Sequence, residues 1–308
     1  MLESIVNVKH GNDERNISQL CVSEYSSNKG KHSAIPTHPK YNSTSGVLAN
    51  IVSGSKEFQM RGKLPLDFCN IKKFMLSRVP IGIELFFNEP STYLFSSKDN
   101  ADFKFSMTDC KLYVPYVRVN PSLELANADL LKQNKPAVYP FVSSVLRKYT
   151  VSSGNHLFET EDLFQGKVPM ETLVCMVSSE DASSGYTHNP YSFQSFKLSE
   201  IKFKVDEITS SMKMKFSSDG NKTAQPFMAL TNMYPELEMS MSTFKKVTPF
   251  FVFDTRNNYE DGSLPMLRKG FTRLEMRFDE PLTKNIIVYV LAKFPSVMQI
   301  DEARSVTV

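Results

Sequence analysis

Strict two-residue alternation of apolar and polar side chains near the end of the chain constrains the fold more than any other feature. In LEMRFDEPLTKNIIVYVLAKF (residues 274–294), Leu274, Met276 and Phe278 alternate with charged residues, and a turn then leads into an almost continuous apolar run. Alternation is typical of a strand with one face in a core and one in water, whereas an apolar run indicates a strand covered on both faces. The stretch therefore predicts two antiparallel strands, one of them central.

Shorter segments repeat this alternation along much of the chain. They lie at residues 64–68, 81–87, 103–107, 110–119, 201–205 and 212–216. Strands at such spacing predict an all-β body folded as a jelly-roll β-sandwich. Residues 1–57 are rich in Ser, Asn and Lys and contain too few large apolar residues for a core. We therefore expect a polar leader over 1–57, disordered or acting as a docking arm, and a jelly-roll domain over 58–308.

Two helical insertions are expected within this body. In NPSLELANADLLKQN (residues 120–134), Asn120 is suited to cap a helix and Pro121 to occupy its first turn. The spacing predicts that Leu123, Ala126 and Leu130 form one apolar face of this helix. A second, Met-rich segment over residues 226–246 predicts a helix that Pro235 kinks or splits.

No group of residues in the sequence points to catalysis or to a bound cofactor. The five histidines form no HxH or HExxH pair, and the four cysteines form no CxxC pair. The acidic group at 254–261 lacks the spacing of a calcium loop and is interpreted as a polar turn. The acidic group at 159–162 could do acid–base work only if a carboxylate were desolvated, and it is interpreted as a solvated helix start or loop. We therefore predict a protein that is not an enzyme and uses no metal or cofactor.

Charge and hydropathy limit the expected partners. The net charge is only +3, with acids and bases interleaved, which disfavours specific nucleic-acid binding. The first residues lack the charged and apolar segments of a signal peptide, and no run approaches about 18 apolar residues, so we expect neither a signal peptide nor membrane association. Unpaired cysteines are typical of a reducing compartment, the cytoplasm or nucleus of a cell.

Several strings, in order along residues 59–306, resemble the major capsid protein of Maverick/Polinton elements and the related adintoviruses. They include RGKLPLDF (61–68), VRVNPSLELANADLL (117–131), an LF-G-P segment before a strand, an NP--F--F element, and closing RF-EPL and ID--R strings. The positions carrying the last three are Asn189, Pro190, Phe193, Phe196, Arg277, Phe278, Glu280, Pro281, Ile300, Asp301 and Arg304.

This resemblance implies a jelly-roll sandwich of the viral capsid type and a structural function. Members of the family carry two jelly rolls per chain and form trimers that serve as pseudo-hexameric capsomers of a virion shell. The expected partners are copies of the same chain and other capsid proteins. The strings quoted above match the second roll, so the chain is expected to be the C-terminal half of a longer capsid gene, or a decayed or domesticated copy.

Two other functions remain open from the sequence. One is a host-domesticated intracellular β-sandwich binding module derived from a capsid gene, which would be monomeric and would present a concave aromatic patch. The other is a jelly-roll enzyme, which would need a metal or a His/carboxylate cluster that the sequence does not contain.

Overall fold

The computed structural model describes residues 54–59, 64, 66–71, 73–94, 102–183, 185–216, 222–235, 240–246, 249–256 and 267–308. The predicted leader therefore lies outside the described residues, apart from residues 54–57. Most of the acidic turn at 254–261 also lies outside them.

Two antiparallel sheets form the body. Sheet A contains, in spatial order, β1 (Ala137–Val151), β10 (Ile286–Ile300), β4 (Glu171–Ser178) and β7 (Phe251–Asp254), and the short β11 (Val306–Thr307) also pairs with β10. Sheet B contains β2 (Leu157–Thr160), β9 (Thr272–Phe278), β5 (Leu198–Val205) and β6 (Ile208–Lys213). A two-stranded ribbon joins β3 (Lys167–Val168) and β8 (Arg268–Lys269).

The order of the strands identifies the topology. Numbered along the chain, the eight strands of the two main sheets run 1-8-3-6 in sheet A and 2-7-4-5 in sheet B. The first strand thus pairs with the eighth, the second with the seventh, the third with the sixth and the fourth with the fifth. A ribbon of paired strands rolled up in this way is a jelly roll. The all-β jelly-roll sandwich predicted from the sequence is confirmed.

Alternation in the strands of sheet B matches their burial. Leu274, Met276 and Phe278 of β9 are buried, whereas the charged residues between them face outward. The same holds for β5, whose Phe203 stacks on Phe253 of sheet A with 5.4 Å between ring centroids. The core therefore lies between the two sheets, as the period-two pattern predicted.

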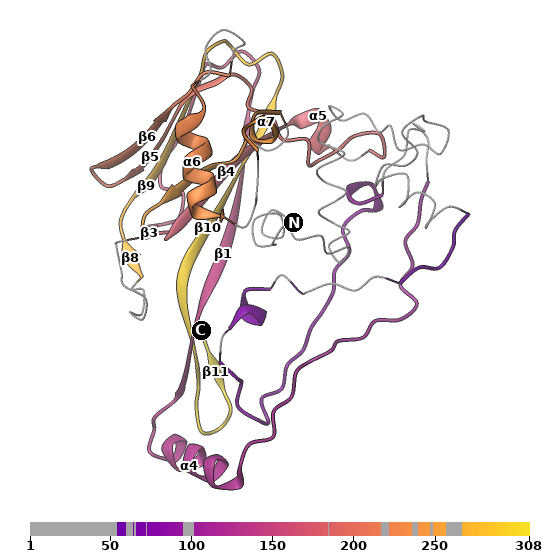
Figure 1. The fold of residues 1–308 in the computed structure, drawn as a ribbon, viewed down its shortest axis with the longest axis vertical. Coiled ribbons are helices and arrows are strands. Elements are labelled where there is room, and N and C mark those ends of the chain that lie inside the picture. The colour runs from indigo at the N-terminus through magenta and orange to yellow at the C-terminus, as the bar shows by residue number, and fades with distance from the viewer. Residues whose placement is uncertain are drawn as a thin grey trace.

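Strand β10 is buried on both faces over the half that lies within the sheet, as its apolar run predicted. It is also twice as long as sheet A requires, because β4 accompanies it only from Ile286 to Lys293. Beyond that point residues 294–300 pair only with residues 137–143 of β1, apart from the short β11 at the far end. We call these two segments the arm. Figure 1 shows the arm extending away from the sandwich, with a helix near its end.

Helices occur where the sequence placed them. The first long helix, α4 (Pro121–Lys132), is capped by Asn120, whose side chain accepts a hydrogen bond from the Ser122 amide at 3.1 Å. The Met-rich segment is split, as predicted, into α6 (Ala224–Met233) and α7 (Met241–Lys246), with Pro235 between them. One further turn, α5 (Ser179–Ala182), follows β4. Aromatic contacts tie α6 and α7 to the edge strand β7 through Phe227, Phe244 and Phe251.

The apolar face predicted for α4 is not buried. Leu123 and Leu130 are exposed, and the buried residue of this helix is Leu131. The helix lies near the end of the arm rather than against the sandwich, which leaves this face uncovered by the sheets (Figure 1).

Four of the predicted strands are also wrong. The described residues within 64–68, 81–87, 103–107 and 110–119 belong to no strand, and the elements among the described residues of 64–119 are the short 3-10 helices η1 (Asp67–Asn70) and η2 (Pro90–Thr92). Alternation reports which face of a segment could be buried, but a strand also needs a neighbouring backbone. No such neighbour is found among the described residues. The eight strands of the sandwich therefore begin at Ala137, although the predicted domain began at residue 58.

Candidate functional site: a charged row and an exposed apolar arm

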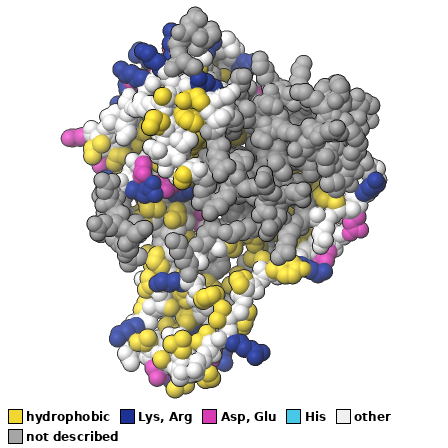
Figure 2. Space-filling model, viewed as in Figure 1, with side chains coloured by type: hydrophobic (Ala, Val, Ile, Leu, Met, Phe, Trp, Pro, Cys, Tyr) yellow, Lys and Arg dark blue, Asp and Glu magenta, His cyan; other side chains and the backbone are white. Residues whose placement is uncertain are grey.

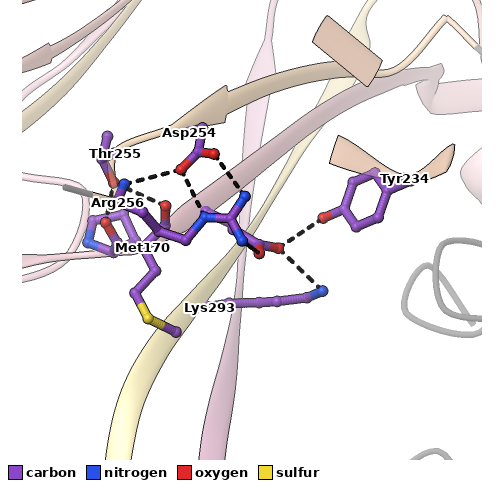
Figure 3. Close-up of polar contacts among 8 residues, drawn as sticks. Met170, Tyr234, Asp254, Thr255, Arg256 and Lys293 are labelled. Atoms are coloured by element: carbon purple, nitrogen blue, oxygen red, sulfur yellow. Dashed lines mark hydrogen bonds and ion pairs between the residues drawn. The ribbon is translucent and has the colours of Figure 1, made fainter. Parts of the chain in front are cut away.

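A row of charged side chains crosses the rim of sheet A where β4 begins. Glu171, the first residue of β4, pairs in register with Lys293 of β10 on one side and with Asp254 of β7 on the other. Lys293 Nζ lies 3.2 Å from Glu171 Oε2, and both side chains are largely buried, with 15% and 14% of their surface exposed. Figure 3 shows Lys293 and Asp254 of this row together with Arg256 and Tyr234.

Arg256 resolves the repulsion between the two carboxylates of this row. Like charges placed opposite each other on neighbouring strands are destabilising. The Arg256 guanidinium contacts Glu171 Oε1 at 3.3 Å and Asp254 Oδ2 at 2.6 Å. Burial alone would raise the pKa of Asp254, but the side-chain and backbone hydrogen bonds from Arg256, with its charge, lower it. The row is therefore stabilised as alternating charges.

Tyr234 adds a neutral donor to the same carboxylate. Its hydroxyl donates to Glu171 Oε2 at 3.1 Å, and Lys293 Nζ lies 5.1 Å from the centre of its ring. Burial and the neighbouring Glu171 charge raise the pKa of the Tyr234 hydroxyl, so it remains a donor at neutral pH. Tyr234 follows α6, and the contact thus attaches that helix to sheet A. This arrangement is that of a clamp between elements, because every charge has an opposite charge beside it.

The outer face of sheet B is also charged. Lys202 lies 3.3 Å from Glu200 and 3.5 Å from Glu275, and Lys204 pairs with Glu275 as well. A shallow open hollow on this face is lined by Leu157, Glu200, Lys202, Glu275 and Arg277. These cross-strand pairs make this face of the sandwich a well-solvated surface.

One side of the arm carries an apolar row that faces solvent. Val138 and Val142 of β1 are 37% and 38% exposed, and Val297 of β10 is 38% exposed. Together with Leu146, farther along β1, they lie on one side of the ribbon, because residues two apart share a face and Val297 pairs with Pro140. We call Val138, Val142, Leu146 and Val297 the apolar stripe. Figure 2 shows apolar side chains gathered over the arm and α4, in the lower part of the view.

The positions carried by the capsid resemblance do not converge on one place. Asn189 and Phe193 are buried in the loop after α5, where Asn189 accepts a hydrogen bond from the Tyr191 amide at 2.9 Å. Phe193 bridges to Val177 of β4 and packs on Phe250 with 5.1 Å between ring centroids. Pro190 and Phe196 are partly buried in the same loop. This first group therefore fixes a loop against sheet A.

A second group lies at the end of β9 and a third at the end of β10. Phe278 is buried and Arg277 lies on the outer face, while Glu280 in the following turn pairs with Lys197 at 2.5 Å and Pro281 is exposed. At the arm, Ile300 is buried, and Asp301 accepts backbone hydrogen bonds that close the turn containing Arg304. The roles of these residues in assembly remain predictions.

The charged row was not found by sequence reasoning, although one signal was available. Lys293 interrupts the apolar run IIVYVLAKF, and a charge inside such a strand needs a partner when it is buried. The partner could not be identified, because Glu171 is more than one hundred residues away in the sequence. Among the described residues, no group of three or more His, Cys, Asp or Glu side chains could hold a metal ion. No helix in the described part of the chain is both long and apolar enough to span a bilayer.

Comparison with known proteins gives distant similarities. No protein-family model matches the chain. An uncharacterized protein of Caenorhabditis elegans is 21% identical over 180 residues, which are 58% of this chain and 43% of that protein. The chain therefore spans less than half the length of this relative.

Two solved structures are similar to about half of the chain. One is a chain of the Sputnik virophage from a 3.5 Å cryo-EM structure. The matched region is 56% of this chain and 38% of the virophage chain, with 9% sequence identity and a TM-score of 0.38. The other is the mavirus major capsid protein. The matched region is 56% of this chain and 41% of the mavirus chain, with 11% sequence identity and a TM-score of 0.32. The assignment of the jelly roll rests on the strand order described above.

Proposed function

We propose that the chain is a structural protein of the capsid type, which forms the shell of a virus-like particle by self-association as trimers and has no catalytic activity. The observation that carries this proposal is the jelly-roll strand order, found in a chain whose sequence resembles the second roll of a capsid protein. Jelly rolls serve as capsid, lectin and cupin domains, so the fold by itself leaves the function open.

The distribution of side chains supports a packing role. The charged groups at the sheet A rim and on the outer face of sheet B pair among themselves, which favours rigidity of the subunit. By contrast, the apolar stripe on the arm faces solvent. Exposed apolar surface of this kind commonly marks contacts with another protein. We assign the stripe to contact with a second copy of the chain.

Sedimentation velocity and electron microscopy of the purified chain test the proposal. We expect trimers at micromolar concentration and larger assemblies on concentration, since permanent interfaces bury about 2,000 Å² or more. Replacing Val142 with Asp should weaken the trimer, because it places a charge in the stripe. Leu157→Asp, at an exposed position of β2 outside the arm, is a control for the charge. A strict monomer at all concentrations would contradict the shell function.

A second candidate is a domesticated binding module in an animal cell. The relative in Caenorhabditis elegans favours it, because a sequence similar over 180 residues occurs in a protein of an animal. This function requires a monomer that binds a defined partner. It would be supported by a monomeric wild-type chain whose apolar stripe becomes protected from hydrogen exchange only when that partner is present.

A further inference from the structure

The outer edge of β1 is the longest sheet edge in the described structure. β1 is the terminal strand of sheet A and spans 15 residues. A long edge of unpaired N–H and C=O groups can pair with a strand from another molecule. In an antiparallel pair, alternate residues direct both backbone groups away from the partner strand. In β1 these are the even-numbered residues, because the Val138 carbonyl and the Ser144 amide bond to groups outside the sheet.

Two charged side chains occupy this edge. Asp67 accepts hydrogen bonds from both the amide and the hydroxyl of Ser144, at 2.7 and 3.0 Å. The Lys73 ammonium donates to the Val138 carbonyl at 3.2 Å. Each side chain therefore supplies the hydrogen bond that a neighbouring strand would supply with its backbone.

The segment that carries these side chains follows β1 in an antiparallel sense. From Asp67 to Lys73 it advances six residues, and from Ser144 to Val138 β1 goes back six. The segment is not a paired strand, because residues 67–70 form the 3-10 helix η1, and both contacts are made by side chains. We call the described residues of this segment, 66–71 and 73–79, the strap.

Apolar contacts hold the strap on the side of the arm opposite the apolar stripe. Tyr139, Met298 and Ile300 of the arm are buried there. The strap residues packed against them are Ile71, Met75, Leu76 and Val79. The Tyr139 hydroxyl also accepts a hydrogen bond from the Leu76 amide at 3.0 Å. The strap is therefore anchored by a small core of its own in addition to the two charged contacts.

Two further features of β1 disfavour pairing along the same edge. Pro140 lies at an outward-directed position, where it has no N–H to offer. Lys148 is exposed farther along the strand, and lysine on an edge strand opposes pairing with another sheet. The strap, Pro140 and Lys148 thus all disfavour pairing of the β1 edge with another strand.

We propose that the strap guards a strand-docking edge, and that the occupant it excludes is β1 of a second copy of the chain. Without the strap, two β1 edges can pair antiparallel about a twofold axis, because the edge is then the same surface on both molecules. An edge guard would serve any β-sandwich, so the proposal is independent of the shell function.

The double variant Asp67→Ala/Lys73→Ala tests this guard. Its control is Asp109→Ala/Lys111→Ala, which also removes one acid and one base from the N-terminal half and breaks an exposed ion pair. We expect hydrogen exchange at the Ser144 amide to accelerate at least about tenfold in the strap variant but not in the control, since the amide loses a charged acceptor. Sedimentation should then reveal a concentration-dependent species absent from the control.

A third substitution tests whether the new species forms through the edge. Val142→Pro, added to the strap variant, removes an outward-directed N–H without removing a bond to β10, and should return the oligomeric state to that of the control. Where the double variant does not fold, Lys73→Ala alone gives the sedimentation comparison, with Lys111→Ala as its control, because Lys73 is exposed and bonds the Val138 carbonyl.

Two results would overturn the guard. One is unchanged exchange at Ser144, and the other is accelerated exchange with the same species as the control at every concentration. A wild-type monomer combined with an associating strap variant would refute the shell function and leave the guard intact.

Discussion

Replacing Glu171 with Gln removes one negative charge from the row at the rim of sheet A and keeps the shape of the side chain. The wild-type carboxylate contacts Lys293 at 3.2 Å, Arg256 at 3.3 Å and the Tyr234 hydroxyl at 3.1 Å. In the variant, Arg256 retains Asp254, but Lys293 loses this carboxylate while its side chain stays 15% exposed. The cost should therefore come mainly from the Lys293 ammonium.

The size of the effect follows from the burial of the pair. A hydrogen bond to a charged partner contributes about 1.5–3 kcal/mol, and breaking a fully buried ion pair costs about 3–5 kcal/mol. Some water reaches Glu171, whose side chain is 14% exposed. We therefore expect the free energy of unfolding to fall by about 2 kcal/mol, between the value for an exposed pair and that for a buried one.

Urea unfolding followed by circular dichroism measures this change as a lower midpoint with an unchanged slope. The control is Lys111→Gln, which breaks a pair whose side chains are 68% and 64% exposed and should cost less than about 0.5 kcal/mol. Equal midpoints for the two variants would refute the reasoning, because the row would then contribute no more than a surface ion pair.

Three other substitutions or reactions test the fold. Gly270→Ala should lower stability by about 1–3 kcal/mol in thermal unfolding, because its Cβ would lie 2.6 Å from the Asp206 carboxylate that binds the Phe271 amide; an unchanged melting temperature would mean that Asp206 moves freely. Phe203→Ala should cost about 3–5 kcal/mol and Phe86→Ala, at an 87% exposed site, less than about 0.5 kcal/mol; similar costs would contradict the assignment of the core. A thiol reagent should modify Cys69 and Cys110 but not Cys175 in the folded protein, since burial raises the pKa of the Cys175 thiol; labelling of Cys175 before unfolding, detected by mass spectrometry, would contradict its burial.

The strands of the sandwich could be predicted where one or both faces are buried in the core. In β9, Leu274, Met276 and Phe278 alternate with charged residues because one face of sheet B is exposed to solvent and the other is buried in the core. In β10 the apolar run reflects burial on two sides. The break between α6 and α7 could be predicted because proline cannot continue a helix.

Strand pairing could not be predicted in the same way. Residues 81–87 and 110–119 also carry alternating apolar side chains, yet they belong to no strand and are exposed in the described structure. Periodicity depends on the residue and its near neighbours, whereas pairing depends on a backbone elsewhere in the chain or in another molecule. The sequence therefore contains more strand-like segments than the eight-stranded sandwich uses.

The candidate site was hidden for a related reason. Glu171, Arg256 and Lys293 form a row only after β4, β7 and β10 have been placed side by side in a particular register. The arm likewise results from a difference in length, since β4 stops at the level of Lys293 while β10 continues for seven residues. A two-stranded ribbon is marginally stable in water, so each side of the arm needs a cover. The strap covers one side in the described structure, and the proposed contact with a second copy of the chain would cover the apolar stripe on the other.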